Sequence, residues 1–187
     1  MLAACGGSDD NSAQNDPPPT DASAAPAADA ERPASSASGE QTPESAELAT
    51  ALGELFTGST TLADGATFDG AALASGDSVV WFWAPWCTIC RAEAPEVAEV
   101  AEQFGADVTL IGVPGRGDLD EMREFVDDTG TGSLTHVADL GGDIWSAFGV
   151  YGQPAFAFID DDGSVEVFIG GMGGKALAER IAELVAA

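Results

Sequence analysis

The sequence WFWAPWCTICRAEAP, residues 81–95, carries the pattern from which the fold of this chain can be inferred. It continues an uncharged run that begins at Val79, which is typical of a strand buried on both faces of a sheet. After a break at Pro85, residues with high helix propensity follow Cys87. The pattern therefore predicts that Cys87 and Cys90 lie where a buried strand passes into a helix.

A cysteine at the start of a helix is chemically activated. The first backbone amides of a helix have no intrahelical acceptor, and together with the helix dipole they stabilise a nearby anion. Such a cysteine forms a thiolate more readily than a free cysteine, whose pKa is about 8.5. The two-residue spacing also allows the sulfurs of Cys87 and Cys90 to join. We therefore interpret the pair as a redox-active disulfide.

A Cys-x-x-Cys pair has two other interpretations besides redox chemistry. A zinc site would need further ligands, but the sequence has no second such pair and its only histidine is His136. A purely structural disulfide would close a loop too short to restrict the unfolded chain much. Redox chemistry is preferred over both, and no metal is expected.

Composition divides the chain into two parts. Residues 1–43 consist mainly of Ala, Ser, Pro, Asp, Gly, Asn and Gln and contain no aromatic residue. Such a segment cannot bury enough apolar surface to offset its loss of conformational entropy, which predicts a disordered tether. Residues 44–187 carry every aromatic residue and almost every branched aliphatic one, which predicts one domain.

The net charge excludes some classes of partner. The chain has 32 acidic and 6 basic residues, for a formal net charge of −26. Most of this charge falls in the predicted domain. A surface of this sign repels nucleic acid and anionic membrane surfaces, so we expect no nucleic-acid partner.

The start of the chain, Leu2-Ala3-Ala4-Cys5 followed by small and polar residues, resembles the lipobox of bacterial lipoproteins. The resemblance implies that Cys5 carries a lipid and that the tether holds the domain off the membrane. A signal peptide would also have a charged and an apolar region before the lipobox, whereas only four residues precede Cys5 here. An unpaired cysteine in a disordered tail is the alternative.

The order of the predicted elements indicates an α/β fold. Apolar strands at 79–83 and 107–113 are each followed by a helical pattern, which is typical of parallel strands with right-handed crossovers. Strands at 155–159 and 165–169 have so short a link that they must be antiparallel. An Asp-Gly turn within 60–70 predicts an N-terminal hairpin. The sequence therefore predicts a central mixed sheet flanked by helices.

These elements resemble the thioredoxin fold, and specifically the extracytoplasmic TlpA/ResA/DsbE group of thiol-disulfide oxidoreductases. The string from Val80 to Pro95 and the later Gln-Pro-Ala-Phe at 153–156 are similar to the secreted DsbE-like oxidases of high-GC Gram-positive bacteria. The resemblance covers about residues 56–185. It implies a thioredoxin-like fold and disulfide exchange with secreted or membrane-associated proteins at the outer face of the cell membrane.

The resemblance also assigns roles to single residues. Cys87 matches the exposed nucleophile of the family, and Cys90 matches the buried resolving thiol. Pro154 matches a cis-proline whose loop lies against the disulfide. A cis bond at Gln153–Pro154 would turn the Gln153 backbone toward an extended segment of substrate. An ordinary trans proline is the alternative.

Proton transfer needs a residue other than the one that thioredoxins use. Thioredoxins have a buried aspartate six residues before the nucleophilic cysteine, where this chain has Trp81, which cannot accept a proton. Glu93, one turn beyond Cys90, matches a glutamate near the active site of ResA-like proteins and is our candidate. A solvated helix glutamate is the alternative. Trp86 is expected to shield the disulfide and to contact substrates.

The implied reaction is thiol-disulfide exchange, in the oxidising direction, with protein thiols or disulfides as substrates and no cofactor. A membrane redox partner would have to reset the cysteine pair. Disulfide reduction for cytochrome c maturation is the enzymatic alternative. A copper-binding thioredoxin-like module that uses His136 is an alternative of another class. Peroxidase activity is disfavoured, because Ala84 stands where peroxiredoxins have a threonine, three residues before the cysteine.

Overall fold

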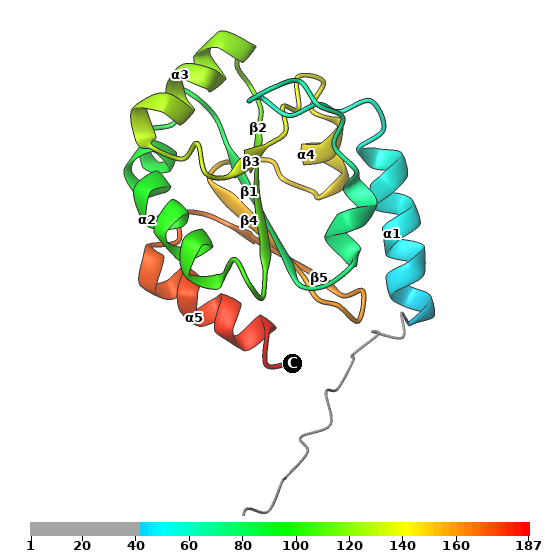
Figure 1. Cartoon of the computed structure of the whole chain (residues 1–187). Helices are drawn as coiled ribbons and strands as arrows, with labels where there is room; N and C mark the ends of the chain where they lie inside the picture. Colours follow the sequence, from blue (N-terminus) through cyan, green and yellow to red (C-terminus); the bar gives the residue numbers. More distant parts are fainter. Residues whose placement is uncertain (1–41) are drawn as a thin grey trace, which may run out of the picture. The chain divides into compact units, whose positions relative to one another are not determined.

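The structure is a computed structural model that describes residues 42–187 (Figure 1). The predictions of a tether and of lipid attachment at Cys5 fall outside the described residues. In the described part, five strands form one sheet in the order β3-β2-β1-β4-β5. Strands β1, β2 and β3 are parallel, whereas β4 is antiparallel to β1 and to β5. The predicted mixed sheet is confirmed.

The elements follow one another in the order that the sequence predicts. The strands are β1 Ser78–Trp83, β2 Thr109–Pro114, β3 Thr135–His136, β4 Ala155–Ile159 and β5 Val165–Ile169. The helices are α1 Pro43–Leu55, the 3-10 helix η1 Gly70–Ala74, α2 Thr88–Phe104, α3 Leu119–Thr129, α4 Asp143–Ala147 and α5 Gly174–Leu184. Among the described helices, none has both the length and the apolar composition needed to cross a bilayer.

Strand β1 lies at the centre of the sheet, between β2 and β4, and all six of its residues are buried. Its uncharged sequence suits this place because side chains on both faces of the strand enter a core. Trp81 and Trp83 point into one apolar cluster, and Val80 and Phe82 point into the other. The alternation of a strand thus connects two cores through one element.

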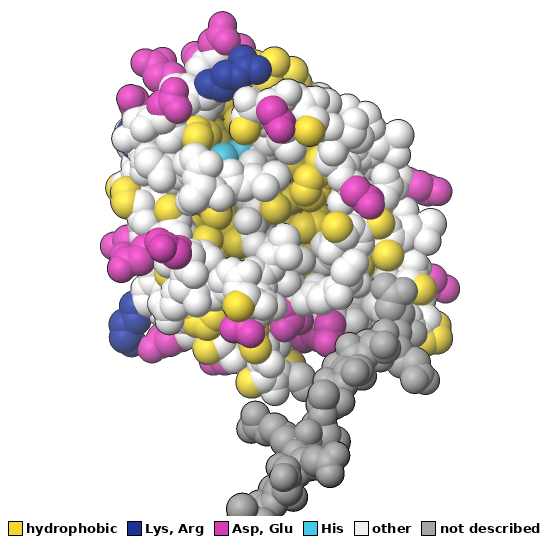
Figure 2. Space-filling view, viewed as in Figure 1, with side chains coloured by type: hydrophobic (Ala, Val, Ile, Leu, Met, Phe, Trp, Pro, Cys, Tyr) yellow, Lys and Arg dark blue, Asp and Glu magenta, His cyan; other side chains and the backbone are white. Residues whose placement is uncertain are grey.

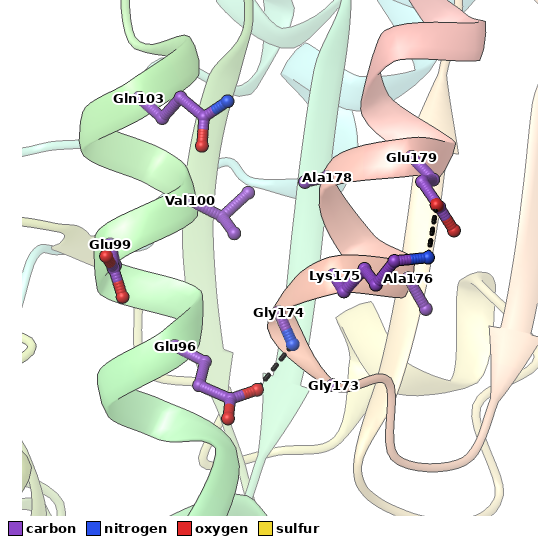
Figure 3. Close-up of a pocket in the computed structure, with 10 residues that line it drawn as sticks. All are labelled: Glu96, Glu99, Val100, Gln103, Gly173, Gly174, Lys175, Ala176, Ala178 and Glu179. Carbon is purple, nitrogen blue, oxygen red and sulfur yellow. Dashed lines mark hydrogen bonds and ion pairs between the residues drawn. The ribbon is translucent and has the colours of Figure 1, made fainter.

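Helices cover both faces of the sheet (Figure 1). Helices α2, α3 and α5 pack on the face of Trp81 and Trp83, while α1 and α4 pack on the opposite face. The contact between α2 and α5 includes a hydrogen bond from the Gly174 amide, in the first turn of α5, to the Glu96 carboxylate of α2 at 2.5 Å (Figure 3). Because Gly173 offers no side-chain cap, Glu96 satisfies a free amide of α5. This bond fixes the loop before α5 against α2.

The N-terminal hairpin is much shorter than the sequence predicts. A single antiparallel bridge joins Thr60 to Thr67, and the Thr61 amide donates to the Ala66 carbonyl at 2.9 Å. Strand pairing stops there because the chain turns toward β3: Thr61 pairs with Val137, and the next amide, that of residue 62, donates to the carbonyl of residue 136. The expected hairpin therefore adds no strands to the sheet.

Candidate active site

Cys87 and Cys90 form a disulfide at the start of α2, as the sequence pattern predicts. Cys87 is the N-cap of the helix, and its Sγ accepts a hydrogen bond from the Cys90 amide at 3.1 Å. A sulfur in this position lies against the free amides and the positive end of the helix dipole. The electrostatic conditions that favour a thiolate are therefore present at Cys87.

The exposure of Cys87 is lower than the family resemblance implied. Its exposed fraction is 6 %, against 0 % for Cys90. The expectation of an exposed nucleophile therefore needs correction: Cys87 is largely covered, although it remains the more accessible of the pair. The reason is that its side chain folds back over the first turn of α2, where the sulfur caps the helix and bonds to Cys90.

The loop that carries Pro154 lies beside the first turn of α2. The Gln153–Pro154 peptide bond is cis, and the Pro154 carbonyl accepts a hydrogen bond from the Gly170 amide at 2.9 Å. A Cβ atom placed on Gly171 would lie 3.1 Å from Ile89 Cγ2 and 3.8 Å from Pro154 Cγ. Gly171 thus allows the Cys-x-x-Cys segment and the Pro154 loop to approach each other.

Glu93 is buried within the protein, with an exposed fraction of 7 %. Its Oε1 accepts a hydrogen bond from the Trp81 indole at 2.9 Å, and its Oε2 accepts one from the Met172 amide at 3.1 Å. Burial raises the pKa of Glu93 to about 7, although both hydrogen bonds favour the charged form. Glu93 is therefore not a solvated helix residue, and it titrates near neutral pH.

Trp86 stands at the surface beside Cys87, with an exposed fraction of 59 %. Its indole donates a hydrogen bond to the carbonyl of Arg116 at 2.8 Å, which fixes one edge of the ring and leaves a face open. Ile89 and Tyr151 are also largely exposed, the second at 79 %. Exposed apolar side chains near a disulfide are suited to contact a protein partner.

Arg116 is a residue of this region that the sequence analysis missed. Its guanidinium donates to Gln153 Oε1 at 3.0 Å and to the Tyr151 carbonyl at 2.9 Å, and lies 4.9 Å from the ring centroid of Trp145. It also lines a cavity of about 370 Å³ together with Leu140 and Trp145. The available signal was one basic residue between two glycines directly after a predicted strand in a chain poor in cations.

His136 lies in the core and not at the disulfide. Its exposed fraction is 4 %, its Nδ1 accepts a hydrogen bond from the Trp83 indole at 3.3 Å, and its Nε2 donates to the Thr131 carbonyl at 3.0 Å. Burial lowers its pKa to about 4. Because both ring nitrogens are engaged, the geometry argues against a copper ligand at this position.

Another place in the described residues brings possible metal ligands together. Carboxylate oxygens of Asp77, Asp160 and Asp161 lie within 4.8 Å of one another. The Asp161 amide donates to Asp77 Oδ1 at 3.1 Å, so part of this cluster stabilises the turn between β4 and β5. The cluster belongs to that turn and not to the disulfide, and we assign it no metal.

Comparisons with known proteins agree with this geometry. The family model described as the AhpC/TSA family matches residues 54–168. The chain belongs to the AhpC/TSA family. One relative by sequence is the soluble secreted antigen MPT53 of Mycobacterium tuberculosis, which is 42 % identical over 104 residues. That alignment spans 56 % of this chain and 59 % of MPT53, so it leaves about two fifths of the relative unmatched.

Solved structures give a longer match to this AhpC/TSA-family chain. The structure of dsbF of M. tuberculosis, in mixed oxidised and reduced forms, has 41 % identity and a TM-score of 0.65, and the match covers 70 % of this chain and 96 % of dsbF. A secreted M. tuberculosis disulfide oxidoreductase homologous to E. coli DsbE has 38 % identity and a TM-score of 0.64, with 70 % and 98 % covered. The thioredoxin-like fold is thereby confirmed.

The structure brings most of the sequence-predicted site residues together. Cys87, Cys90 and Glu93 lie on the first turns of α2, and Glu93 and Pro154 both approach Gly171. Trp86 and Gln153 are joined through Arg116. The seventh predicted site residue, Cys5, lies outside the described residues.

Proposed function

We propose that this protein is a thiol-disulfide oxidoreductase that oxidises thiols of secreted or membrane-associated proteins. The observation that carries the proposal is the Cys87–Cys90 disulfide at the first turn of α2, beside the loop of Gln153 and Pro154. The names of its relatives support it, since two are called a disulfide oxidoreductase and a thiol:disulfide interchange protein. Nothing in this chemistry requires a cofactor.

The reaction begins when a substrate thiolate attacks Cys87 Sγ. A bond forms between the substrate sulfur and Cys87, the Cys87–Cys90 bond breaks, and its electron pair goes to Cys90. A second substrate thiolate then attacks the substrate sulfur of this mixed disulfide, and Cys87 leaves as a thiolate. The substrate loses two electrons and the cysteine pair gains two. The greater accessibility of Cys87 supports its role as the attacked sulfur.

Glu93 is the proposed proton donor for Cys90. When the disulfide opens, the thiolate of Cys90 is left in a fully buried position, where a charge is costly. A carboxylic acid whose pKa is about 7 holds its proton near neutral pH and can release it there. The Trp81 indole and the Met172 amide then stabilise the carboxylate that remains. The burial and the two donors together support this role.

The substrate is proposed to lie across the loop of Gln153 and Pro154 as a short extended segment that pairs with the Gln153 backbone. The exposed face of Trp86 would then contact an apolar side chain near the target cysteine. Trp86 and Gln153 are each hydrogen-bonded to Arg116, which supports the proposal that they form one binding surface.

The proposed location is the outer face of the cell membrane. The relative MPT53 is named a soluble secreted antigen, which supports a place outside the cytoplasm. Anchoring through a lipid on Cys5, a tether over residues 1–43 and a membrane partner that reoxidises the cysteine pair complete the proposal. Exchange in an oxidising compartment would maintain the disulfide between turnovers.

Oxidative refolding tests the proposal. Reduced, denatured ribonuclease should regain activity with the oxidised protein as the only oxidant, at one disulfide per protein molecule. Cys87→Ser should abolish this transfer, while Cys5→Ser, which removes the third cysteine, should leave it intact. Stoichiometric reduction of insulin by the reduced protein, with no oxidation of ribonuclease, would instead identify a reductase.

A further inference from the structure

Arg116 differs from the other cationic side chains of residues 42–187 in having no carboxylate partner. Four of the five form ion pairs, namely Arg91, Arg123, Lys175 and Arg180. The guanidinium of Arg116 instead contacts neutral groups: the side-chain oxygen of Gln153, the carbonyl of Tyr151 and the ring of Trp145. No described carboxylate therefore neutralises its charge at ion-pair distance.

The guanidinium also has donors to spare. An arginine side chain carries five N–H donors in a planar fork that matches the two oxygens of a carboxylate. The bonds to Gln153 and Tyr151 use one N–H on each terminal nitrogen. Arg116 is exposed, so the remaining donors are accessible from solvent. Arg116 is therefore a charged group that has free N–H donors and is already oriented by its neutral contacts.

The position of Arg116 connects it to both sides of the redox centre. Its carbonyl holds the indole of Trp86, next to Cys87, and its guanidinium holds Gln153, next to Pro154. Its backbone has φ 57°, a left-handed conformation that is uncommon for a residue with a side chain. Such a conformation persists where surrounding contacts determine it, and it often occurs at functional sites.

Arg116 is a positive charge on a surface that is mostly acidic. Acidic side chains are spread over the visible face of the molecule, and few basic ones accompany them (Figure 2). A negative surface repels acidic substrates at a distance, whereas a local cation attracts a carboxylate at one point. An arginine without a carboxylate partner that is bonded to both Trp86 and Gln153 is therefore suited to attract an acidic group of a substrate.

We propose that Arg116 is a specificity-determining residue that binds an acidic side chain next to the target cysteine of the substrate. This inference rests on the proposed function, because it assumes that a polypeptide thiol reaches Cys87. The acidic side chain would form an ion pair with the free donors of the guanidinium. The preferred substrate class is thus a polypeptide with aspartate or glutamate within two residues of the cysteine.

Matched peptides test the inference. The probes are short reduced peptides with one cysteine that carry either Glu or Gln at one of the four positions within two residues of it. The measurement is the second-order rate constant for opening of the disulfide in the full chain. We expect a Glu peptide to react about twofold to fivefold faster than its Gln partner at one or more positions, which is the range for one accessible ion pair.

Variants at residue 116 assign the preference. Arg116→Asn removes the charge and keeps a residue that tolerates left-handed backbone, so it should bring the ratio of Glu to Gln rates to about one. Arg116→Lys keeps the charge and should retain a preference of the same sign. Lys175→Gln removes one exposed charge that is already paired with Glu179 and should leave the ratio unchanged, which controls for net charge.

Several outcomes would overturn the inference. One is that the native protein shows no preference for Glu peptides at any position. Another is that Arg116→Asn retains the native preference for Glu peptides. Equal slowing of Glu peptides, Gln peptides and the uncharged reagent dithiothreitol would mean that Arg116 acts on the thiols themselves. If Arg116→Asn failed to fold, a preference in the native protein that persisted unchanged in 1 M NaCl would contradict an exposed ion pair.

Failure of the proposed function would look different. In that case the native disulfide would react with neither peptide at an appreciable rate, although dithiothreitol reduced it. Exchange with both peptides at equal rates would leave the oxidoreductase intact and remove only the role of Arg116.

Discussion

The indole of Trp81 donates a hydrogen bond to the carboxylate of Glu93 at 2.9 Å, inside the protein and one helical turn from Cys90. By the resemblance to thioredoxins, residue 81 corresponds to their buried aspartate, whereas the buried acid of this chain, Glu93, lies on helix α2. Trp81 supplies a donor there and cannot itself carry the proton. The acid that remains, Glu93, has its pKa raised to about 7 by burial.

The first prediction concerns Glu93→Gln. We expect the variant to slow the step in which Cys90 leaves by about tenfold. This effect is smaller than the usual contribution of a general acid, because a thiolate can leave without being fully protonated. In the native protein the rate constant of this step, calculated per substrate thiolate, should fall as pH rises through about 7, where Glu93 loses its proton, and the variant should lack that dependence. Stopped-flow kinetics of mixed-disulfide formation from pH 5 to 9 provide the test.

The matched control for this variant is Glu99→Gln, which removes an exposed carboxylate from the same helix. It should retain the native rate and pH dependence. A Glu93→Gln protein with the native pH profile would rule out Glu93 as the proton donor, whatever its effect on stability.

The stability contribution of this group changes with pH in the same direction as the predicted rate. The folded-state pKa of Glu93 lies above the ordinary value of 4.5, so the folded protein binds the proton more tightly than the unfolded chain. This contribution is fully present below pH 4.5 and is lost as pH rises through about 7. Denaturant titrations of native protein and Glu93→Gln should therefore show a difference in unfolding free energy that changes over this interval.

The second prediction concerns Trp81→Phe, which removes the indole donor. Because that hydrogen bond favours the charged form of Glu93, its loss should raise the Glu93 pKa above its value of about 7. The pH midpoint of the Cys90-leaving step should shift upward in the same direction. An unchanged midpoint, measured on a variant with native circular dichroism, would mean that the Trp81–Glu93 bond has no part in proton transfer.

The third prediction concerns His136 and acid stability. Burial lowers its folded-state pKa from 6.5 to about 4, so the unfolded chain binds the proton more tightly than the folded protein. Stability from this group is present above pH 6.5 and is lost as pH falls toward 4, by about 3 kcal/mol over the full interval. In His136→Gln the slope of unfolding free energy against pH between 6.5 and 4 should decrease. An equal slope in both proteins would contradict a neutral, buried imidazole.

The fourth prediction concerns Gly112→Ala. A Cβ atom at Gly112 would lie 2.2 Å from His136 Nδ1 and 2.8 Å from Trp83 Nε1, and both side chains are buried. Neither side chain can move away without breaking the hydrogen bond between Trp83 and His136. We therefore expect the variant to lose about 3 kcal/mol in unfolding free energy. Gly132→Ala is the control, because its Cβ would approach only Val126, at 3.9 Å. Equal unfolding free energies for the two variants would show that this packing is looser than described.

Much of the fold could be predicted because its signals are local. The uncharged run before Pro85 and the cysteines after it place strand β1 and helix α2, and the short link between residues 159 and 165 requires an antiparallel pair. The hairpin around Gly65 was overestimated because the turn is local, whereas the competing contact of Thr61 with Val137 is distant in sequence. Sequence pattern reports the first kind of contact and not the second.

The site was predicted to the extent that a motif carried it. Cys87 and Cys90 have a recognisable spacing, and Glu93 follows them by one turn. The partners of Glu93 could not be inferred, since Trp81 and Met172 come from a strand and from a loop far along the chain. Arg116 was missed for the same reason: its contacts with Trp86 and Gln153 exist only after three separate segments meet.

The most direct test of the central claim is the equilibrium of the Cys87/Cys90 pair with reduced and oxidised glutathione. If the pair is an oxidant of protein thiols, the equilibrium should be reversible, with a potential closer to the DsbA value of about −120 mV than to the thioredoxin value of about −270 mV. A disulfide that glutathione does not open, with a potential below about −300 mV, would be structural and would contradict the account.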